Sequence, residues 1–328
     1  MKYKSILVTG ATGSFGQKFI SHILKNQTVK RLVVYSRDEL KQFEMQKKFQ
    51  FNNHNKKLRF FIGDIRDQSR LETATNKIDL VIHAAALKQV KAAEYNPIEF
   101  IKTNVIGSQN LIEACIKSKV KKIIALSTDK AAAPINLYGA TKLCSDKLFI
   151  AANEYSGNNL ICSVVRYGNV FGSRGSVVEK FLKIKKNFPI TSKEMTRFSL
   201  SLEQSVKVVQ WAIDNSLGGE IIVPKISTYR ITDLVKAFNE KARSKVIGIG
   251  RGEKISEDLI TKSDSISTYD IGKYYLILKD SDKETLGKFK KKFKTIKKVS
   301  KDFFYNSSNN KFLSLRDIKK NINELKLK

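Results

Sequence analysis

A glycine-rich turn stands directly behind a short apolar run near the start of the chain. Residues 5–8 predict a buried strand, residues 9–16 carry three glycines, and an amphipathic helix pattern follows. Gly10 allows a tight turn, Gly13 lets the backbone approach a pyrophosphate, and Gly16 lets helix and strand pack closely. Free N–H groups at the helix N-terminus then face the anion. This context predicts a dinucleotide-binding loop, whose contact residues are Gly10, Thr12, Gly13, Ser14, Phe15 and Gly16.

Strand and helix patterns alternate through the first half of the chain. A long helix is expected to begin at Asn96–Pro97, with Asn as the cap and Pro at the first helical position. Strands that alternate with helices behind a glycine loop predict an α/β fold with a doubly wound parallel sheet, whose ligands bind beyond the carboxyl ends of the strands. The expected strands cover residues 31–36, 58–63, 79–86, 122–128 and 160–166, and an expected helix covers 38–51.

From Gly172 onward the alternation weakens. A helix pattern covers 202–215, a turn falls at Gly218–Gly219, a strand covers 220–223, and a helix opens at Thr232–Asp233. We therefore expect residues 1–171 to form the dinucleotide-binding domain, and residues 172–328 to form mainly a smaller substrate-binding domain and a basic tail, with later segments returning to the first domain. The polar, Lys-rich segment 279–301 is expected to be mobile.

Composition limits the other classes of function. The 328 residues can bury a core without disulfides, and the three cysteines, Cys115, Cys144 and Cys162, lack metal-site spacing, so we expect buried thiols and no metal. The net charge of +30 (61 basic against 31 acidic residues) raises a nucleic-acid alternative, but the lysines are spread along the chain without a recognition motif. Apolar runs are too short to span a bilayer. We expect a cytoplasmic protein with no nucleic-acid or membrane partner.

A second group of reactive side chains follows the expected strand at 122–128. Tyr138 and Lys142 are spaced i,i+4, so on a helix they share a face, and an ammonium beside a phenol lowers the pKa of the phenol. Thr128, Asp129 and Lys130 fall at the carboxyl end of the strand, where this fold binds its ligands. An ion pair that caps the strand end is the structural alternative for Asp129 and Lys130.

Cofactor choice depends on the end of the second strand. Ser36, Arg37 and Lys41 favour NADP, because basic residues there pair with its 2′-phosphate, whereas Asp38 leaves NAD open. Asn104 either positions backbone near the cofactor or is a buried amide satisfied by the main chain. The remaining residues expected around the dinucleotide are Asp64, Ile65, Ala84, Ala85, Ala86, Lys88 and Asn104, together with Tyr138 and Lys142.

The motifs together resemble the extended short-chain dehydrogenase/reductases, which have a Rossmann domain and a smaller C-terminal substrate domain. Within them, residues 126–132, 134–143 and 145–149 are similar to the inverting UDP-N-acetylglucosamine 4,6-dehydratases (5-epimerases) of pseudaminic acid synthesis. Retaining dehydratases typically carry Asp-Glu where this chain has Asp129-Lys130, and a sister inverting group carries Met in place of Tyr138. The string Gly250-Arg251-Gly252 departs from the expected Arg-Pro-Gly, which leaves a diphosphate contact there open.

This resemblance implies a redox-neutral dehydration of UDP-N-acetylglucosamine. Tyr138 would take the C4 hydroxyl proton with help from Thr128, Lys130 would remove the C5 proton, and Asp129 would donate to the leaving C6 hydroxyl. Lys130 can do this only if its pKa falls toward neutrality, which burial and the Lys142 cation would favour. The resemblance also implies a homo-oligomer. The expected substrate-binding residues are Lys88, Asn169, Arg174, Thr196, Arg197 and Lys225.

Other functions remain open on the sequence. A nucleotide-sugar 4-epimerase on the same fold would keep Tyr138 and Lys142 but would have no use for Asp129 and Lys130 as an acid/base pair. A cofactor-bound protein without catalysis would need none of these side chains.

Overall fold

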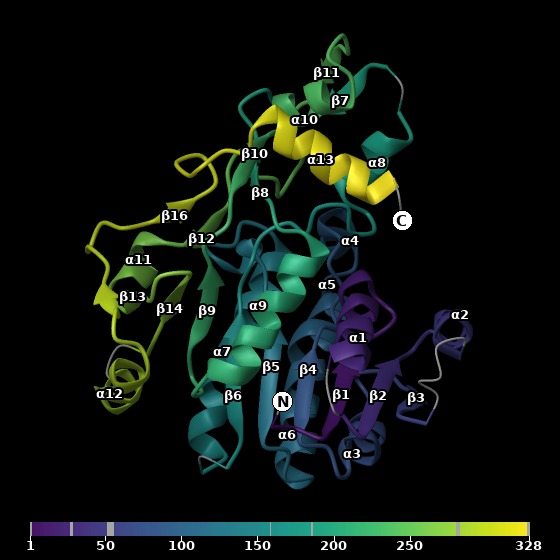
Figure 1. Cartoon of the computed structure of the whole chain (residues 1–328), viewed down its shortest axis with the longest axis vertical. Coiled ribbons are helices and arrows are strands. Elements are labelled where there is room, and N and C mark those ends of the chain that lie inside the picture. Colours follow the sequence, from purple (N-terminus) through teal and green to yellow (C-terminus); the bar gives the residue numbers. More distant parts are fainter. Residues whose placement is uncertain are drawn as a thin grey trace.

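A computed structural model of the chain describes residues 2–26, 29–50, 56–157, 159–184, 186–279 and 283–326. Within these ranges its main feature is a sheet of ten strands in the order β15-β13-β14-β9-β6-β5-β4-β1-β2-β3 (Figure 1). The strands from β3 to β9 all run parallel. In spatial order these are β3 (Leu58–Ile62), β2 (Arg31–Ser36), β1 (Ser5–Thr9), β4 (Leu80–His83), β5 (Lys122–Leu126), β6 (Ile161–Val165) and β9 (Ile221–Pro224).

Helices pack on both faces of this sheet, as a doubly wound fold requires. Successive residues of a strand point to opposite faces, so in β1 Ile6 and Val8 enter one apolar core and Leu7 the other. The first core lies under α1 (Ser14–Asn26), α2 (Glu39–Gln50) and α9 (Leu202–Asn215). The second core lies under α3 (Gln68–Thr75), α6 (Gly107–Lys117) and α7 (Leu137–Tyr155).

Two elements of the first half differ from the sequence-based expectation. The strand expected over 79–86 stops at His83, because the backbone turns there over the glycine loop, where a Cβ on Gly10 would lie 2.7 Å from the Ala84 carbonyl oxygen. The helix expected from Asn96–Pro97 does begin at Pro97, as α5 (Pro97–Phe100), and passes through the π-helix η1 (Ile101–Ile106) into α6. The Asn96 side chain donates to Ala92 O instead of capping α5.

The second half of the chain returns to the sheet. Beyond β9, the antiparallel strands β14 (Tyr274–Ile277), β13 (Thr268–Asp270) and β15 (Lys297–Lys298) extend it. The segment expected to be mobile, 279–301, contains β15 and the helix α12 (Lys283–Lys292), whose Phe289 is fully buried in the first core. Residues 280–282 of that segment lie outside the described ranges. A buried aromatic anchor therefore holds a segment whose composition is mostly polar.

A smaller unit with its own apolar core lies beyond the carboxyl ends of the parallel strands (Figure 1). Phe181, Phe188, Leu234 and Ile318 are buried in this core. Its elements are α8 (Val177–Leu182), β7 (Phe188–Ile190), β8 (Thr196–Phe198), β10 (Thr228–Arg230), α10 (Ile231–Phe238), β11 (Ser244–Val246) and α13 (Leu315–Lys326). Among the described residues, every helix is too short or too polar to cross a membrane.

Candidate active site

A cleft of about 580 Å³ opens where the carboxyl ends of the parallel strands face the smaller unit. Most residues expected to bind the cofactor or to catalyse line this cleft. Five expected residues do not line it, namely Asn104, Arg174, Thr196, Arg197 and Lys225. Those that do are Gly10, Thr12, Gly13, Ser14, Phe15, Gly16, Ser36, Arg37, Lys41, Asp64, Ile65, Ala84, Ala85, Ala86, Lys88, Thr128, Asp129, Lys130, Tyr138, Lys142 and Asn169.

The glycine loop has the shape that a dinucleotide pyrophosphate requires. Gly10 has a left-handed φ of 62°, and a Cβ on Gly16 would lie 2.4 Å from the Ala11 carbonyl oxygen, so the chain can turn this tightly into α1 only with glycine at both positions. The first turn of α1 holds no acidic side chain, which leaves its N–H groups for an anion. The residues present therefore fit the expected nicotinamide dinucleotide.

The adenosine end of the cleft contains both the acid and the bases that bear on cofactor choice. Lys41 is ion-paired with Asp38, so that carboxylate is already engaged by a cation. The Arg37 side chain is 58% exposed, and its Nη1 lies 4.0 Å from Asp64 Oδ2. The hydroxyl of Ser36 accepts a hydrogen bond from Gln42 Nε2. Arg37 thus presents a largely exposed guanidinium at this end of the cleft, in a long ion pair with Asp64.

Asn104 positions the loop that follows β4. Its amide oxygen accepts from Leu87 N, and its amide nitrogen donates to Leu87 O, both at 2.9 Å. The same nitrogen donates to Thr141 Oγ1 on α7 at 3.0 Å. The amide is therefore buried and satisfied by its neighbours, and it also holds the backbone of Leu87, which lines the cleft, so both alternatives for this residue fit the structure.

The expected catalytic residues converge from two neighbouring elements. Thr128 and Asp129 begin the 3₁₀ turn η2 (Asp129–Ala131), which follows β5. The Asn136 side chain caps α7 by accepting from Gly139 N, so Tyr138 lies in the first turn of the helix, beside η2. A Cβ on Gly139 would lie 2.2 Å from the Lys130 carbonyl oxygen, so glycine permits the close approach of α7 to η2. Tyr138 and Lys142 are both buried in the wall of the cleft.

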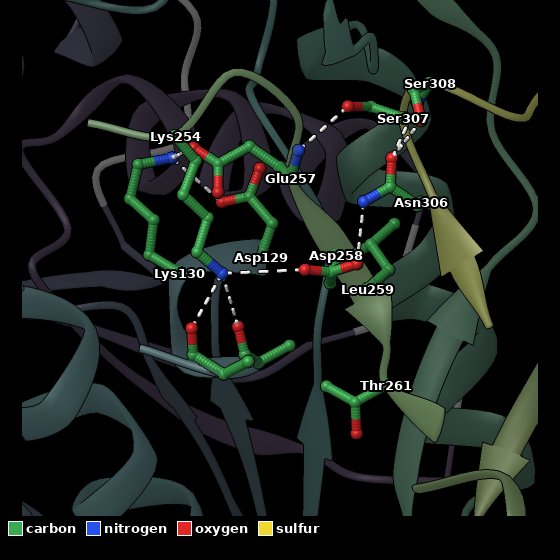
Figure 2. A network of polar contacts seen from close by, with 12 residues as sticks. Asp129, Lys130, Lys254, Glu257, Asp258, Leu259, Thr261, Asn306, Ser307 and Ser308 are labelled. Carbon is green, nitrogen blue, oxygen red and sulfur yellow. Dashed lines mark hydrogen bonds and ion pairs between the residues drawn. The ribbon is translucent and has the colours of Figure 1, made fainter. Parts of the chain in front are cut away.

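Lys130 lies between two carboxylates (Figure 2). Its Nζ donates to Asp129 Oδ1 at 3.0 Å and lies 3.1 Å from Glu257 Oε1. Asp129 Oδ1 also accepts from the Thr128 hydroxyl at 2.9 Å. Among the described residues, neither Asp129 Oδ2 nor Glu257 Oε2 has a hydrogen-bond partner, although both atoms are buried. Each carboxylate thus keeps one oxygen available to a further donor.

The pKa values of Lys130 and Tyr138 both differ from what the sequence led us to expect. Burial lowers the pKa of the Lys130 ammonium, but Asp129 and Glu257 raise it more, so the net pKa lies above its ordinary value. The expected fall toward neutrality is therefore wrong for this structure. Burial also raises the pKa of Tyr138 to about 12, although the Lys130 cation and a hydrogen bond with Thr128 oppose this shift. A lowered phenol pKa, expected from Lys142, is likewise not found.

Lys142 is the lysine of this group whose pKa falls. Burial lowers the pKa of its ammonium, and the Asp146 carboxylate only partly offsets this effect. Asp146 accepts from the Ser127 hydroxyl at 2.7 Å and lies 3.5 Å from an Arg166 nitrogen. This buried network, which sequence reasoning missed, holds α7 against the end of β5 beside the cleft.

The expected substrate residues separate into two groups. Lys88 and Asn169 line the cleft, and the buried Oδ1 of Asn169 has no partner among the described residues. Arg174 instead lies on the glycine loop, where its guanidinium donates to Thr12 O and its backbone N to Ser14 Oγ. It is therefore placed beside the expected cofactor, with Lys88 Nζ donating to its carbonyl oxygen at 3.0 Å.

The other expected substrate residues make contacts within the protein. Arg197 donates to Thr196 O and Ile255 O through Nη1, and to Lys254 O through Nη2. Thr196 exchanges a hydrogen bond with Ser307 Oγ. Lys225 is ion-paired with Asp270 at 2.7 Å, on the sheet extension.

Glu257 is a charged partner of Lys130 that sequence reasoning did not identify. It lies in the segment that precedes β12 (Asp258–Ile260), and it is 2% exposed. In the sequence it is one of two adjacent acids behind Lys254-Ile255-Ser256, with no spacing relation to Lys130. The one signal that could have identified Glu257 as a site residue is its burial, which is unusual for an acid. The local sequence pattern does not show that burial.

Comparison with known proteins shows the family of this chain. A family model described as polysaccharide biosynthesis protein matches residues 6–279. The chain belongs to this family. One family relative, a UDP-N-acetylglucosamine 4,6-dehydratase (inverting) of Campylobacter jejuni, is 50% identical over 315 residues, which cover 94% of this chain and 93% of the relative. A UDP-glucose 4-epimerase of Rickettsia prowazekii is 41% identical over 328 residues, covering 96% and 94%.

Solved structures place this family member in the expected fold class. The X-ray structure of Pen from Bacillus thuringiensis matches with a TM-score of 0.89 and 32% identity over all of both chains. DesIV, a dTDP-glucose 4,6-dehydratase of Streptomyces venezuelae, matches with a TM-score of 0.67 and 19% identity, covering 76% of this chain and 86% of that one, which shows the fold alone. The doubly wound fold and the resemblance to extended short-chain dehydrogenase/reductases are confirmed.

Proposed function

We propose that this protein is a UDP-N-acetylglucosamine 4,6-dehydratase that inverts the configuration at C5. The observation that carries the proposal is the Lys130 amine held 3.0 Å from Asp129 in the same cleft wall as Tyr138. A 4-epimerase needs a tyrosine base but has no step that requires a carboxyl and an amine side by side. The Campylobacter relative, which carries this name at 50% identity, supports the proposal.

The side chains fit the proton movements of the dehydration. When bound, an oxidised nicotinamide dinucleotide supplies the reversible oxidation at C4 and the reduction at C6. Tyr138 would accept the C4 hydroxyl proton after its phenol has released its own proton to solvent, and Thr128, whose hydroxyl contacts the phenol and Asp129, would lie beside the same oxygen. The C4 ketone then acidifies the C5 hydrogen. Reprotonation of C5 from the opposite face completes the inversion.

The contact between Asp129 and Lys130 can prepare both of their roles in one step. The raised pKa favours the ammonium form of Lys130, which must lose a proton before it can act as the C5 base. Asp129 must gain one before it can protonate the leaving C6 hydroxyl. Transfer of the Nζ proton to Asp129 Oδ1 over 3.0 Å breaks one N–H bond, forms one O–H bond and leaves a neutral amine beside a neutral acid.

We further propose NADP as the cofactor. Support comes from Arg37, whose exposed guanidinium borders the adenosine end of the cleft, and from the Lys41 ion pair that occupies Asp38. Arg174 then belongs with the cofactor residues, and Lys88 and Asn169 with the sugar nucleotide. Three expectations stay predictions. They are that residues 172–328 form mainly a substrate-binding domain, that the protein is a homo-oligomer, and that it is cytoplasmic.

The deciding experiment is incubation of the purified chain with UDP-N-acetylglucosamine in D₂O, followed by mass spectrometry and proton NMR. Loss of one water, with deuterium at an inverted C5, is the expected result. An unchanged composition with a new C4 epimer would instead identify the epimerase named among the relatives. Absence of any reaction with this sugar nucleotide would overturn the proposed substrate.

A further inference from the structure

The Glu257 carboxylate reaches Lys130 from the opposite half of the chain (Figure 2). Its Oε1 lies 3.1 Å from Lys130 Nζ, and its side chain is 3% exposed. The Lys130 side chain is itself only 21% exposed, so water screens the pair weakly. A buried carboxylate at this distance changes the protonation of an amine strongly.

The backbone around Glu257 is fixed from several sides. Glu257 N donates to Ser307 Oγ, and Ser307 N donates to Glu257 O, both at 2.9 Å. The Arg197 side chain binds the carbonyl oxygens of Lys254 and Ile255. Lys254 in turn donates to Ala133 O at 2.7 Å, just behind η2. The carboxylate is therefore aimed at Lys130 by a rigid frame that also holds the turn carrying Lys130.

Lys130 is the nearer of two cations that face the Glu257 carboxylate, and Arg197 is the other. Arg197 Nε lies 3.9 Å away, while its remaining nitrogens bind backbone oxygens. Burial raises the pKa of Glu257, and Lys130 opposes that shift. The titratable and charged groups that face Lys130 are Asp129 on η2, Tyr138 on α7, Arg197 on β8, Tyr229 on β10 and Glu257.

We propose that Glu257 is a positioning residue for the proposed acid/base pair, holding the Lys130 amine against Asp129 and making it a stronger base toward the sugar. The inference rests on the proposed function. When the amine takes the C5 proton, the ammonium that forms lies beside the Glu257 carboxylate, which stabilises it. Glu257 itself neither gains nor loses a proton in this step.

Glu257→Gln tests this role, because the amide keeps the size of the side chain and removes its charge. We expect kcat to fall about tenfold to a hundredfold, with KM within about twofold. The rise of kcat with pH that reports loss of the Lys130 proton should move to lower pH by about one unit or more, because one of the anions that retain the proton is gone. Glu257→Asp should restore part of the rate.

A second measurement follows the titration of Lys130 directly and does not depend on enzymatic turnover. In full-length protein labelled with ¹³C at lysine Cε, the Lys130 signal is assigned by its loss in Lys130→Arg and followed with pH. Its midpoint should fall in Glu257→Gln and stay in the control Glu72→Gln, which removes a lysine-paired glutamate on α3, away from the cleft. If Glu257→Gln does not fold, Glu257→Asp should show a smaller fall.

The outcomes separate the two proposals. An unchanged Lys130 midpoint in a folded Glu257 variant, or a lower rate with an unmoved pH profile, would overturn the positioning role. A wild-type chain that does not dehydrate the sugar would overturn the proposed function and, with it, this role. A shifted midpoint in that chain would then show only an electrostatic contact.

Discussion

Lys130 Nζ lies 3.1 Å from Glu257 Oε1, although the two residues belong to opposite halves of the chain. With Asp129 on its other side, the two carboxylates raise the pKa of the Lys130 ammonium above its ordinary value. Lys130, the candidate base, therefore favours the protonated form, which cannot act as a base. It lies close to Asp129, the carboxyl group that must gain a proton. This relationship determines what the following variants should do.

Lys130→Ala should stop dehydration but not the oxidation that precedes it. We expect product formation to fall by about 10²–10⁴-fold, while addition of UDP-N-acetylglucosamine still produces the absorbance of reduced nicotinamide, because C4 oxidation requires Tyr138 and Thr128. Stopped-flow absorbance and product analysis measure the two steps. Lys117→Ala, which removes an exposed lysine that is likewise paired with a glutamate, is the control. Full turnover by Lys130→Ala would refute the assigned base.

Tyr138→Phe should abolish the first oxidation. The phenol must lose its proton to act as a base, and burial raises its pKa to about 12, so in wild type the oxidation rate should rise as the pH increases through the range where the protein stays folded. In Tyr138→Phe saturated with cofactor we expect neither reduced nicotinamide nor product. A variant that still forms the reduced cofactor at the wild-type rate would exclude Tyr138 as the base.

Arg37→Ala should weaken NADP more than NAD. A charge-assisted hydrogen bond to phosphate contributes about 1.5–3 kcal/mol, so the Kd for NADP should rise about tenfold to a hundredfold. The Kd for NAD should change little, since Arg37 is 58% exposed and supports no core contact. Titration calorimetry with both cofactors measures this, with the exposed Arg59→Ala on β3 as the control. Equal loss for both cofactors would argue against a 2′-phosphate contact.

Gly139→Ala should lower stability and activity together. Its Cβ would lie 2.2 Å from the Lys130 carbonyl oxygen, so α7 and η2 must separate, at a cost of about 1–3 kcal/mol or more. Gly287→Ala is the matched control, because its Cβ meets no atom within 4 Å and lies in α12, where alanine should stabilise by up to about 1 kcal/mol. Thermal unfolding should therefore move in opposite directions in the two variants. A Gly139→Ala protein with unchanged Tm would show that the approach is relaxed.

Some of this protein is determined by local sequence. The glycine loop behind a short strand predicts the cradle, since only glycine fits the turn at Gly10 and the packing at Gly16. The i,i+4 spacing of Tyr138 and Lys142 fixes their common face once α7 forms, and their position behind β5 brings them to the cleft. These inferences succeed because each depends on neighbours within one or two elements.

The tertiary structure alone decides the electrostatics of the site. The sequence predicted that Lys130 loses its proton easily, but folding brings Glu257 beside it and reverses the sign of that shift. The sequence resemblance placed Arg197 near a substrate phosphate, which stays a prediction, but it gave no sign that Arg197 also holds the backbone in front of Glu257. Burial and long-range charge set a pKa, and both depend on which distant segments meet. A local sequence pattern does not show which distant segments come into contact.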